Sequence, residues 1–229
     1  MTERTTFIIL YAMRSFSEMK NSALKVLDGN WGQYVGLTFV FYVITIVVSV
    51  VAGGDPRHPN PLHNTLGLVA SLALIPLSYG FAVLFLNAFR GWGERVRMSN
   101  LFDGYRDFGR VFLTLLIQGI YTVLWSLLFV IPGIIKALSY TMTVFVLNDE
   151  PGLSYDAAIT RSSKLMDGHK LDFFLFSLSF IGWWLLSLLT FGIGFLWLVP
   201  YYSTAKAAFY HELLEEEKRN RPTPPRGDL

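Results

Sequence analysis

The stretch MDGHKLDFF, Met166 to Phe174, places Asp-Gly directly in front of a long apolar run. The same arrangement occurs twice more, at Leu27–Tyr34 (LDGNWGQY) and at Phe102–Phe108 (FDGYRDF). A glycine just after the last apolar residue of a helix is a common helix stop, because glycine adopts the left-handed conformation at no steric cost. Each copy therefore predicts a short surface helix that ends at a glycine before the chain turns into an apolar helix; these glycines are Gly29, Gly104 and Gly168.

Apolar runs dominate this chain of 229 residues, of which 52% are hydrophobic and only 16% charged. Soluble domains usually carry about 25% charged residues. Four segments of 21, 26, 25 and 33 residues contain no charge: Tyr34–Gly54, Asn64–Phe89, Val111–Ile135 and Phe173–Ala205. A bilayer core about 30 Å thick needs roughly 20 helical residues, and a helix satisfies all of its backbone groups without water. The sequence therefore predicts an all-α, polytopic membrane protein.

Two of the apolar regions are long enough to form a helical hairpin each. One is interrupted at Ile131-Pro132-Gly133 and the other at Thr190–Gly194, and proline followed by glycine favours a reversal of the chain. We therefore expect six spans, paired as three hairpins: Tyr34–Ala52, Leu66–Phe89, Val111–Val130, Ile134–Asn148 and the two halves of Phe173–His211.

The chain also has the pattern of an internal repeat. An aliphatic residue followed by proline marks every even-numbered span, at Pro76, Pro132 and Pro200. With the Asp-Gly steps, this pattern predicts units at about 15–89, 98–148 and 153–213 within one membrane domain, 15–213. A chance recurrence of Asp-Gly and Ile-Pro in an apolar chain is the alternative. An N-terminal arm (1–14) and a cytoplasmic tail (214–229) flank the domain.

Short amphipathic helices at the cytoplasmic interface are expected to open the units. The first begins at the capping box Ser15–Glu18 and runs to Asp28, the second has about one turn from Ser99, and the third begins after Ser154. Sixteen of the 19 lysines and arginines fall in the N-terminal segment, in the loops after the second and fourth spans, or in the tail. The positive-inside rule then places both termini in the cytoplasm.

Three segments resemble a bacterial integral membrane family known as domain of unknown function 975. They are LDGNWG before the first span, IPGIIKALSY at the second hairpin and SFIGWWLLSLLTFGIGFLWLVPYY over the last two spans. The likeness covers about residues 17 to 213 and implies a bacterial inner-membrane location. The family is also distantly similar to the membrane domain of some glycerophosphodiester phosphodiesterases. The resemblance carries over no catalytic residues.

Several kinds of chemistry find no support in the sequence. The chain has no cysteine, and its net charge of +2 does not suggest nucleic acid as a partner. His58 and His63 lie near Asp55 in an outer loop with three prolines, which do not give the rigid face that a metal site requires. No phosphate loop, dinucleotide fingerprint or nucleophile elbow occurs. We therefore expect neither a cofactor nor a metal, and no enzymatic activity.

Polar residues inside the spans are the better candidates for a site, because a charge at bilayer depth is costly. Lys206 is the most deeply placed charge, whereas Lys136 is close enough to the Pro132-Gly133 turn to reach the outer interface. Gln118 and Tyr201 are candidates to line a polar cleft with them. Interhelical hydrogen bonding is the simpler explanation of such residues.

Two functions remain open from the sequence. The first is a non-enzymatic membrane protein that organises lipid or a membrane-protein partner, with basic residues on anionic headgroups. The alternative is a small transporter or exporter component, because internal repeats and proline-broken helices are common in transporters. A water-filled cleft around Lys206 would favour transport.

Overall fold

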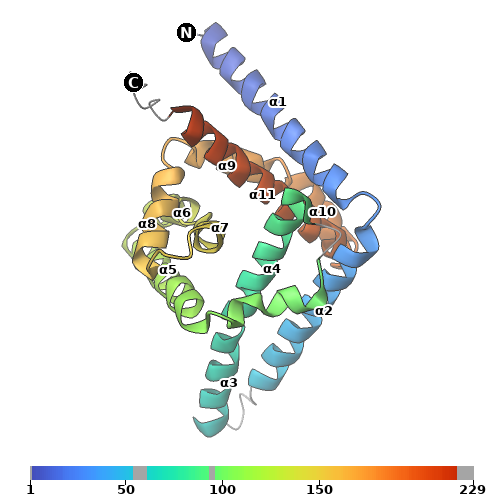
Figure 1. Ribbon diagram of the computed structural model, residues 1–229, viewed down its shortest axis with the longest axis vertical. Coiled ribbons are helices and arrows are strands. Elements are labelled where there is room, and N and C mark those ends of the chain that lie inside the picture. Colours follow the sequence, from blue (N-terminus) through green and yellow to red (C-terminus); the bar gives the residue numbers. More distant parts are fainter. Residues whose placement is uncertain (1, 54–60, 93–95, 221–229) are drawn as a thin grey trace, which may run out of the picture.

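The computed structural model describes residues 2–53, 61–92 and 96–220, and these residues form helices and no strand (Figure 1). The all-α prediction is therefore confirmed for this part of the chain. Five helical segments are long and apolar enough to cross a membrane: Trp31–Ala52, Asn64–Gly91, Phe108–Leu128, Val130–Asp149 and Lys170–Leu189. By length and composition, the chain is built like a polytopic membrane protein.

The N-terminal third of the structure contains three long helical stretches. Helix α1 (Thr2–Leu27) stops before Gly29, whose φ of +76° turns the chain into α2 (Trp31–Ala52). Helix α3 (Pro61–Ala73) packs against α2 and passes through a break at Leu74 into α4 (Ile75–Asn87). Pro76 is the second residue of α4, where its missing N–H costs no helical hydrogen bond. A short π-helix, η1 (Ala88–Trp92), ends this part.

Helix α1 begins earlier than predicted. It starts at Thr2, so Ser15–Glu18 lie inside the helix rather than at its start. Residues 2–14 contain neither glycine nor proline, and nothing in that segment opposes helix propagation strongly. The capping-box prediction was therefore wrong, and the predicted arm is continuous with the first helix.

The middle of the chain forms the second hairpin. It opens with the 3₁₀-helix η3 (Met98–Tyr105), longer than the single turn predicted, and continues as α5 (Phe108–Leu128) and α6 (Val130–Ser139). Pro132 lies in the first turn of α6, as expected for a residue that lacks an N–H. A break at Tyr140–Met142 separates α6 from α7 (Thr143–Asp149).

The C-terminal part begins with α8 (Tyr155–Leu165), which Ser154 precedes as predicted. Gly168, with a φ of +84°, turns the chain into α9 (Lys170–Leu178). Ser179 and Phe180 break the helix before α10 (Ile181–Leu189), and α11 (Phe195–Asn220) follows the last turn. Pro200 lies inside α11 without ending it.

Helix α11 occupies the place of the predicted sixth span, but it is not among the segments apolar enough to cross a membrane. Aromatic pairs trace its antiparallel course along α10 and α9: Trp184–Phe195 at 5.4 Å, Phe180–Tyr202 at 5.2 Å and Phe173–Phe209 at 5.1 Å between ring centroids. Helices α1, α2, α4, α8 and α10 all pack against α11. The prediction of six apolar spans was wrong in number, because a helix shielded by its neighbours need not be apolar throughout.

Gly104 corrects a second prediction. Unlike Gly29 and Gly168, it is not among the described residues with positive φ, and it lies within η3 rather than after a helix. A Cβ on Gly104 would stand 2.9 Å from the carbonyl carbon of Pro76. This glycine is needed for the close approach of η3 to α4 and not for a left-handed turn.

A glycine also lies at a close backbone contact in each of three antiparallel helix pairs. Gly67 faces the backbone of Ala52 between α3 and α2, Gly133 faces Ser126 between α6 and α5, and Gly194 faces Ser187 at the α10–α11 turn. A Cβ on Gly133 or Gly194 would lie 2.7 Å from the facing serine Cα. Small residues allow this close backbone approach, as in other membrane helix pairs.

Large apolar side chains remain exposed toward the ends of these pairs. Val50 is 73% exposed, Leu127 is 78% exposed and Phe191 is 99% exposed. Soluble monomers rarely expose contiguous apolar patches of this kind. Such exposure is typical of helices that face lipid.

Candidate functional site: an apolar groove and a polar pocket

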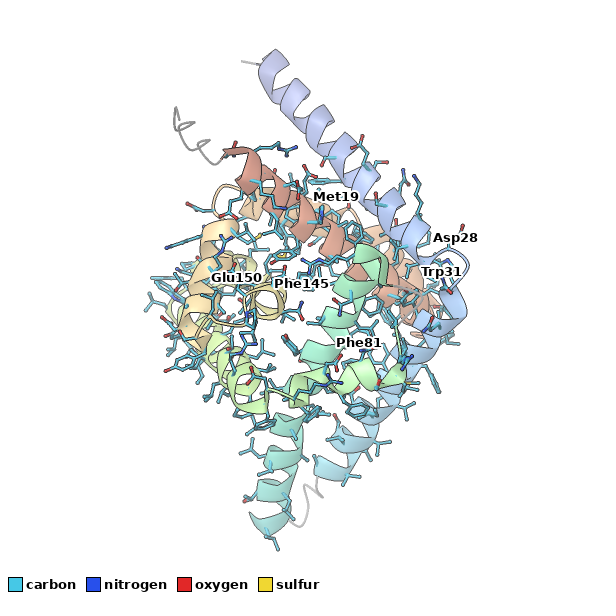
Figure 2. All side chains as sticks on the ribbon, viewed as in Figure 1. Met19, Asp28, Trp31, Phe81, Phe145 and Glu150 are labelled. Carbon is cyan, nitrogen blue, oxygen red and sulfur yellow. The ribbon has the colours of Figure 1, made fainter. Side chains whose placement is uncertain are left out.

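An apolar groove of about 450 Å³ lies where α1 and α2 meet the α10–α11 pair. Three tryptophans line it: Trp31, Trp183 and Trp197. Leu24, Leu186, Leu198 and Tyr201 complete most of its wall. Figure 2 shows Trp31 close to Asp28, at the turn between α1 and α2. The volume and the apolar lining fall within the range of small-molecule sites, and tryptophans are common where a membrane protein meets lipid.

Lys20 lies beside one end of this groove. It is one helical turn before Leu24, so the two side chains share a face of α1. The Lys20 ammonium donates a 3.0 Å hydrogen bond to the Ser179 carbonyl, in the break between α9 and α10, and lies 4.4 Å from the centroid of the Phe180 ring. Burial lowers the pKa of Lys20. Sequence reasoning missed this residue.

A second, polar pocket of about 320 Å³ lies between the α5–α6 pair and α8. Its charged residues are Lys136 from α6 and Asp156, Lys164 and Asp167 from or just after α8. Tyr121, Tyr140, Thr160 and Ser163 add hydroxyl groups. The Tyr121 hydroxyl donates a 3.3 Å hydrogen bond to Asp156, which joins the middle of α5 to the start of α8.

Lys136 is the predicted site residue that this pocket contains. Its ammonium lies 5.0 Å from the Trp125 ring centroid and 6.0 Å from that of Tyr140. The sequence places Lys136 only a few residues past the Pro132-Gly133 turn, and snorkelling to the outer interface was the expected outcome. In the structure Lys136 lines a pocket together with residues of α8, which packs against α5 and α6.

The other predicted site residues are spread over the molecule. Tyr201 lines the apolar groove. Gln118 lies on α5, and its Oε1 is buried without a hydrogen-bond partner among the described residues. Lys206 lies on α11, with its ammonium 5.5 Å from the centroid of the Phe145 ring. Phe145 is in the middle of the view in Figure 2. The structure therefore joins Lys136 with Tyr140, but neither Gln118 nor Lys206 lines the groove or the pocket.

Two ion-pair clamps, which the sequence did not reveal, hold the charged ends of the helices together. Arg90 donates two hydrogen bonds to Asp149, at 2.7 and 2.5 Å, and Tyr210 donates a third at 3.0 Å to the same carboxylate. Arg90 belongs to η1, Asp149 to α7 and Tyr210 to α11. Arg90 and Asp149 lie one residue beyond the ends of the first two predicted units, and Tyr210 lies within the third.

The second clamp centres on Arg161 of α8. Its guanidinium donates two hydrogen bonds to Glu217, at 3.0 and 2.7 Å, and one to Glu150 at 3.0 Å. The hydrogen bonds to Glu217, and then the one to Glu150, raise the pKa of Arg161 even though burial opposes the shift. Such bidentate pairs fix relative helix positions, and a structural role explains both clamps.

Metal chemistry gains no support from the described residues, in which no group of three or more His, Cys, Asp and Glu side chains suits a metal ion. Asp55 and His58, which lie with His63 in the outer loop considered above as a metal site, are outside the described residues.

A family model described as "Protein of unknown function (DUF975)" matches residues 13–141 and 127–217. No curated protein and no solved structure matches the chain.

Proposed function

We propose a non-enzymatic role for this chain, which belongs to the family of proteins of unknown function DUF975. In this role the chain is an integral membrane protein that binds phospholipid and organises the surrounding lipid or a membrane partner. The apolar groove lined by Trp31, Trp183 and Trp197 is the observation that carries this proposal. The distant similarity to the membrane domain of glycerophosphodiester phosphodiesterases stays a prediction, and no part of the proposal depends on it.

The groove suits one acyl chain of a phospholipid. Its wall is mainly aliphatic and aromatic, with Ser187 and Thr190 as the small hydroxyl residues, so a polar ligand would lose hydration there and gain few hydrogen bonds. Lys20, one turn from Leu24, provides an ammonium beside the groove, where it favours an anionic headgroup. A single lipid would then contact α1, α2, α10 and α11 at once.

The location in a bacterial cytoplasmic membrane, with both termini in the cytoplasm, is part of the proposal. The basic residues between the apolar segments support this orientation, and α11 returns along α10 and α9. Single cysteines at Gly168 and Gly192 test it, because the native chain has none. A membrane-impermeant thiol reagent is expected to label the cysteine at 192 from outside the cell and the one at 168 only from inside.

Filling the groove tests lipid binding. Leu186 lines the groove, whereas Leu189, on the same helix and 76% exposed, does not. We expect Leu186→Trp to reduce the lipid retained by the purified protein, measured by native mass spectrometry, and Leu189→Trp to leave it unchanged. Equal lipid retention by both variants and the native protein would refute a lipid site in the groove.

Transport is the second candidate, and one observation favours it. The α9–α10 segment is broken at Ser179–Phe180, near the middle of a stretch apolar enough to span a membrane, and broken helices often form transporter sites. A cysteine at Ser177, beside Tyr202, distinguishes the two functions. Transport predicts its reaction with a water-soluble reagent, whereas a packed lipid-organising protein predicts protection.

A further inference from the structure

The polar pocket between α5, α6 and α8 holds charges of both signs without pairing them across the pocket. These three helices lie together on the left of Figure 1. Lys136 and Lys164 form no ion pair with any described residue, although Asp156 and Asp167 line the same pocket. Asp167 pairs with Lys170 at 3.2 Å, and Asp156 accepts a hydrogen bond from Tyr121. The pocket therefore offers both ammonium donors and carboxylate acceptors to a ligand.

Such a lining matches a compact ligand that carries both an anionic group and a primary ammonium. The anion would accept hydrogen bonds from Lys136 and Lys164, and the ligand ammonium would donate to Asp156 and Asp167. A purely anionic ligand would meet the two carboxylates, and a purely cationic ligand would meet the two lysines. Each of these would leave unfavourable like-charge contacts.

The surroundings of the pocket favour a lipid as the source of this chemistry. Trp125, 39% exposed, packs against the Lys136 ammonium, and Leu124, Leu128 and Ile135 are exposed on the same helix pair. An acyl chain can follow these side chains away from the pocket while the headgroup remains among the charges. Tryptophan and lysine are residues that usually meet at the level of lipid headgroups.

We propose that this pocket binds the headgroup of an aminophospholipid, whose phosphate contacts Lys136 and Lys164 and whose ammonium contacts Asp156 and Asp167. The site shares no lining residue with the apolar groove, so variants in one site test that assignment independently of the other.

Native mass spectrometry of the full-length protein tests the assignment, with dioleoyl phosphatidylethanolamine, phosphatidylcholine and phosphatidylglycerol added at equal concentrations. We expect phosphatidylethanolamine to bind in preference to the other two. Lys136→Met is expected to weaken its binding roughly tenfold, as loss of a hydrogen bond between charged groups typically does. Asp156→Asn is expected to abolish the preference over phosphatidylcholine, because a trimethylammonium group donates no hydrogen bond. Lys25→Met, at an exposed lysine of α1, is the matched control and is expected to bind like the native protein.

Free glycerophosphoethanolamine, which lacks acyl chains, tests whether the ligand of the pocket is a lipid or a soluble zwitterion. If it does not compete with the lipid, the aminophospholipid assignment is supported. If it binds as tightly as the lipid and Lys136→Met weakens it, the lipid source is overturned in favour of a soluble zwitterion. Equal binding of the three lipids by the native protein, or no effect of Lys136→Met and Asp156→Asn, overturns the site itself. Asp156 is exposed on α8, so its variant remains informative if Lys136→Met fails to fold.

Discussion

The ammonium of Lys20 donates a hydrogen bond to the backbone carbonyl of Ser179 and so ties α1 to the break between α9 and α10. A carbonyl in a helix break has lost its helical donor, and Lys20 provides a new one. We expect Lys20→Met to lower the free energy of unfolding by about 0.5–1.5 kcal/mol, the net contribution of a typical hydrogen bond, because it removes the donor of this acceptor. Denaturant unfolding in detergent measures the change. Lys25→Met, on the exposed side of α1, is expected to be neutral, and an equal effect of the two variants would contradict the role of Lys20.

Gly104 and Gly168 are expected to respond differently to the same substitution. Gly168 has a positive φ and open space around the position of a Cβ, and asparagine tolerates that conformation. Gly104 lies against the Pro76 carbonyl, where any Cβ requires η3 to move away from α4. We therefore expect Gly168→Asn to change the melting temperature little. Gly104→Asn is expected to lower the melting temperature strongly, because it lowers the free energy of unfolding by about 1–3 kcal/mol. The opposite order in a thermal shift assay would refute this distinction.

This pair of glycines illustrates what the sequence pattern can predict. The three Asp-Gly steps correctly indicated where each apolar helix would begin, since a turn is a local feature. They also correctly identified Gly29 and Gly168 as left-handed residues. The different role of Gly104 depends on a segment 28 positions earlier in the chain, around Pro76, and local pattern contains no such information.

Gly133 and Gly119 provide a second matched test, on the α5–α6 pair. A Cβ on Gly133 would collide with Ser126, whereas nothing lies within 4 Å of a Cβ on Gly119. We expect Gly133→Ala to destabilise the protein by about 1–3 kcal/mol. Gly119→Ala is expected to stabilise it by about 0.5–1 kcal/mol, because alanine loses less entropy in a helix. Unfolding in detergent measures both, and a neutral Gly133→Ala would mean that the helices do not approach closely there.

Arg90 and Asp149 are expected to be energetically coupled. Their bidentate contact joins η1 to α7, and the Tyr210 hydroxyl shares the carboxylate. Arg90→Met and Asp149→Asn each leave a partly buried group without its partner, so each is expected to be destabilising. The double variant should cost less than the sum, with an interaction energy of about 0.5–3 kcal/mol. Additive effects in this double-mutant cycle would show that the contact contributes nothing measurable.

The clamps and the polar pocket were harder to predict than the helices. One signal in the sequence, a similarity between two segments of the chain, bears on them. The segments LSYGFAVLFLN (77–87) and LSYTMTVFVLN (138–148) share six of eleven residues without a gap. The first lies within the continuous helix α4, but the second contains the α6–α7 break. The hydroxyls of Thr141 and Thr143 there donate to the carbonyls of Ala137 and Tyr140, a local competition with helical bonding. Which charges meet depends on this break and on the docking of α8, so periodicity alone did not bring Lys136 and Asp156 together.

Lys206 remains the residue whose charge the structure explains least. Its ammonium lies near the Phe145 ring, and no hydrogen bond or ion pair joins it to another described residue. A charge held among packed helices without a partner is unfavourable for folding, and replacing such a charge with an apolar residue of similar length is often neutral or stabilising. We therefore expect Lys206→Met to leave the free energy of unfolding unchanged or to raise it by about 1 kcal/mol.

Unfolding in detergent, combined with mass spectrometry of the retained lipid, measures this variant. Lys218→Met, on the exposed end of α11, is the control for a lysine whose ion pair is accessible to water and contributes little. Unchanged stability of Lys206→Met together with a loss of anionic lipid would assign the ammonium to a lipid headgroup. Destabilisation by several kcal/mol with unaltered lipid would instead contradict the expectation, because it would mean that the ammonium is a structural partner within the fold.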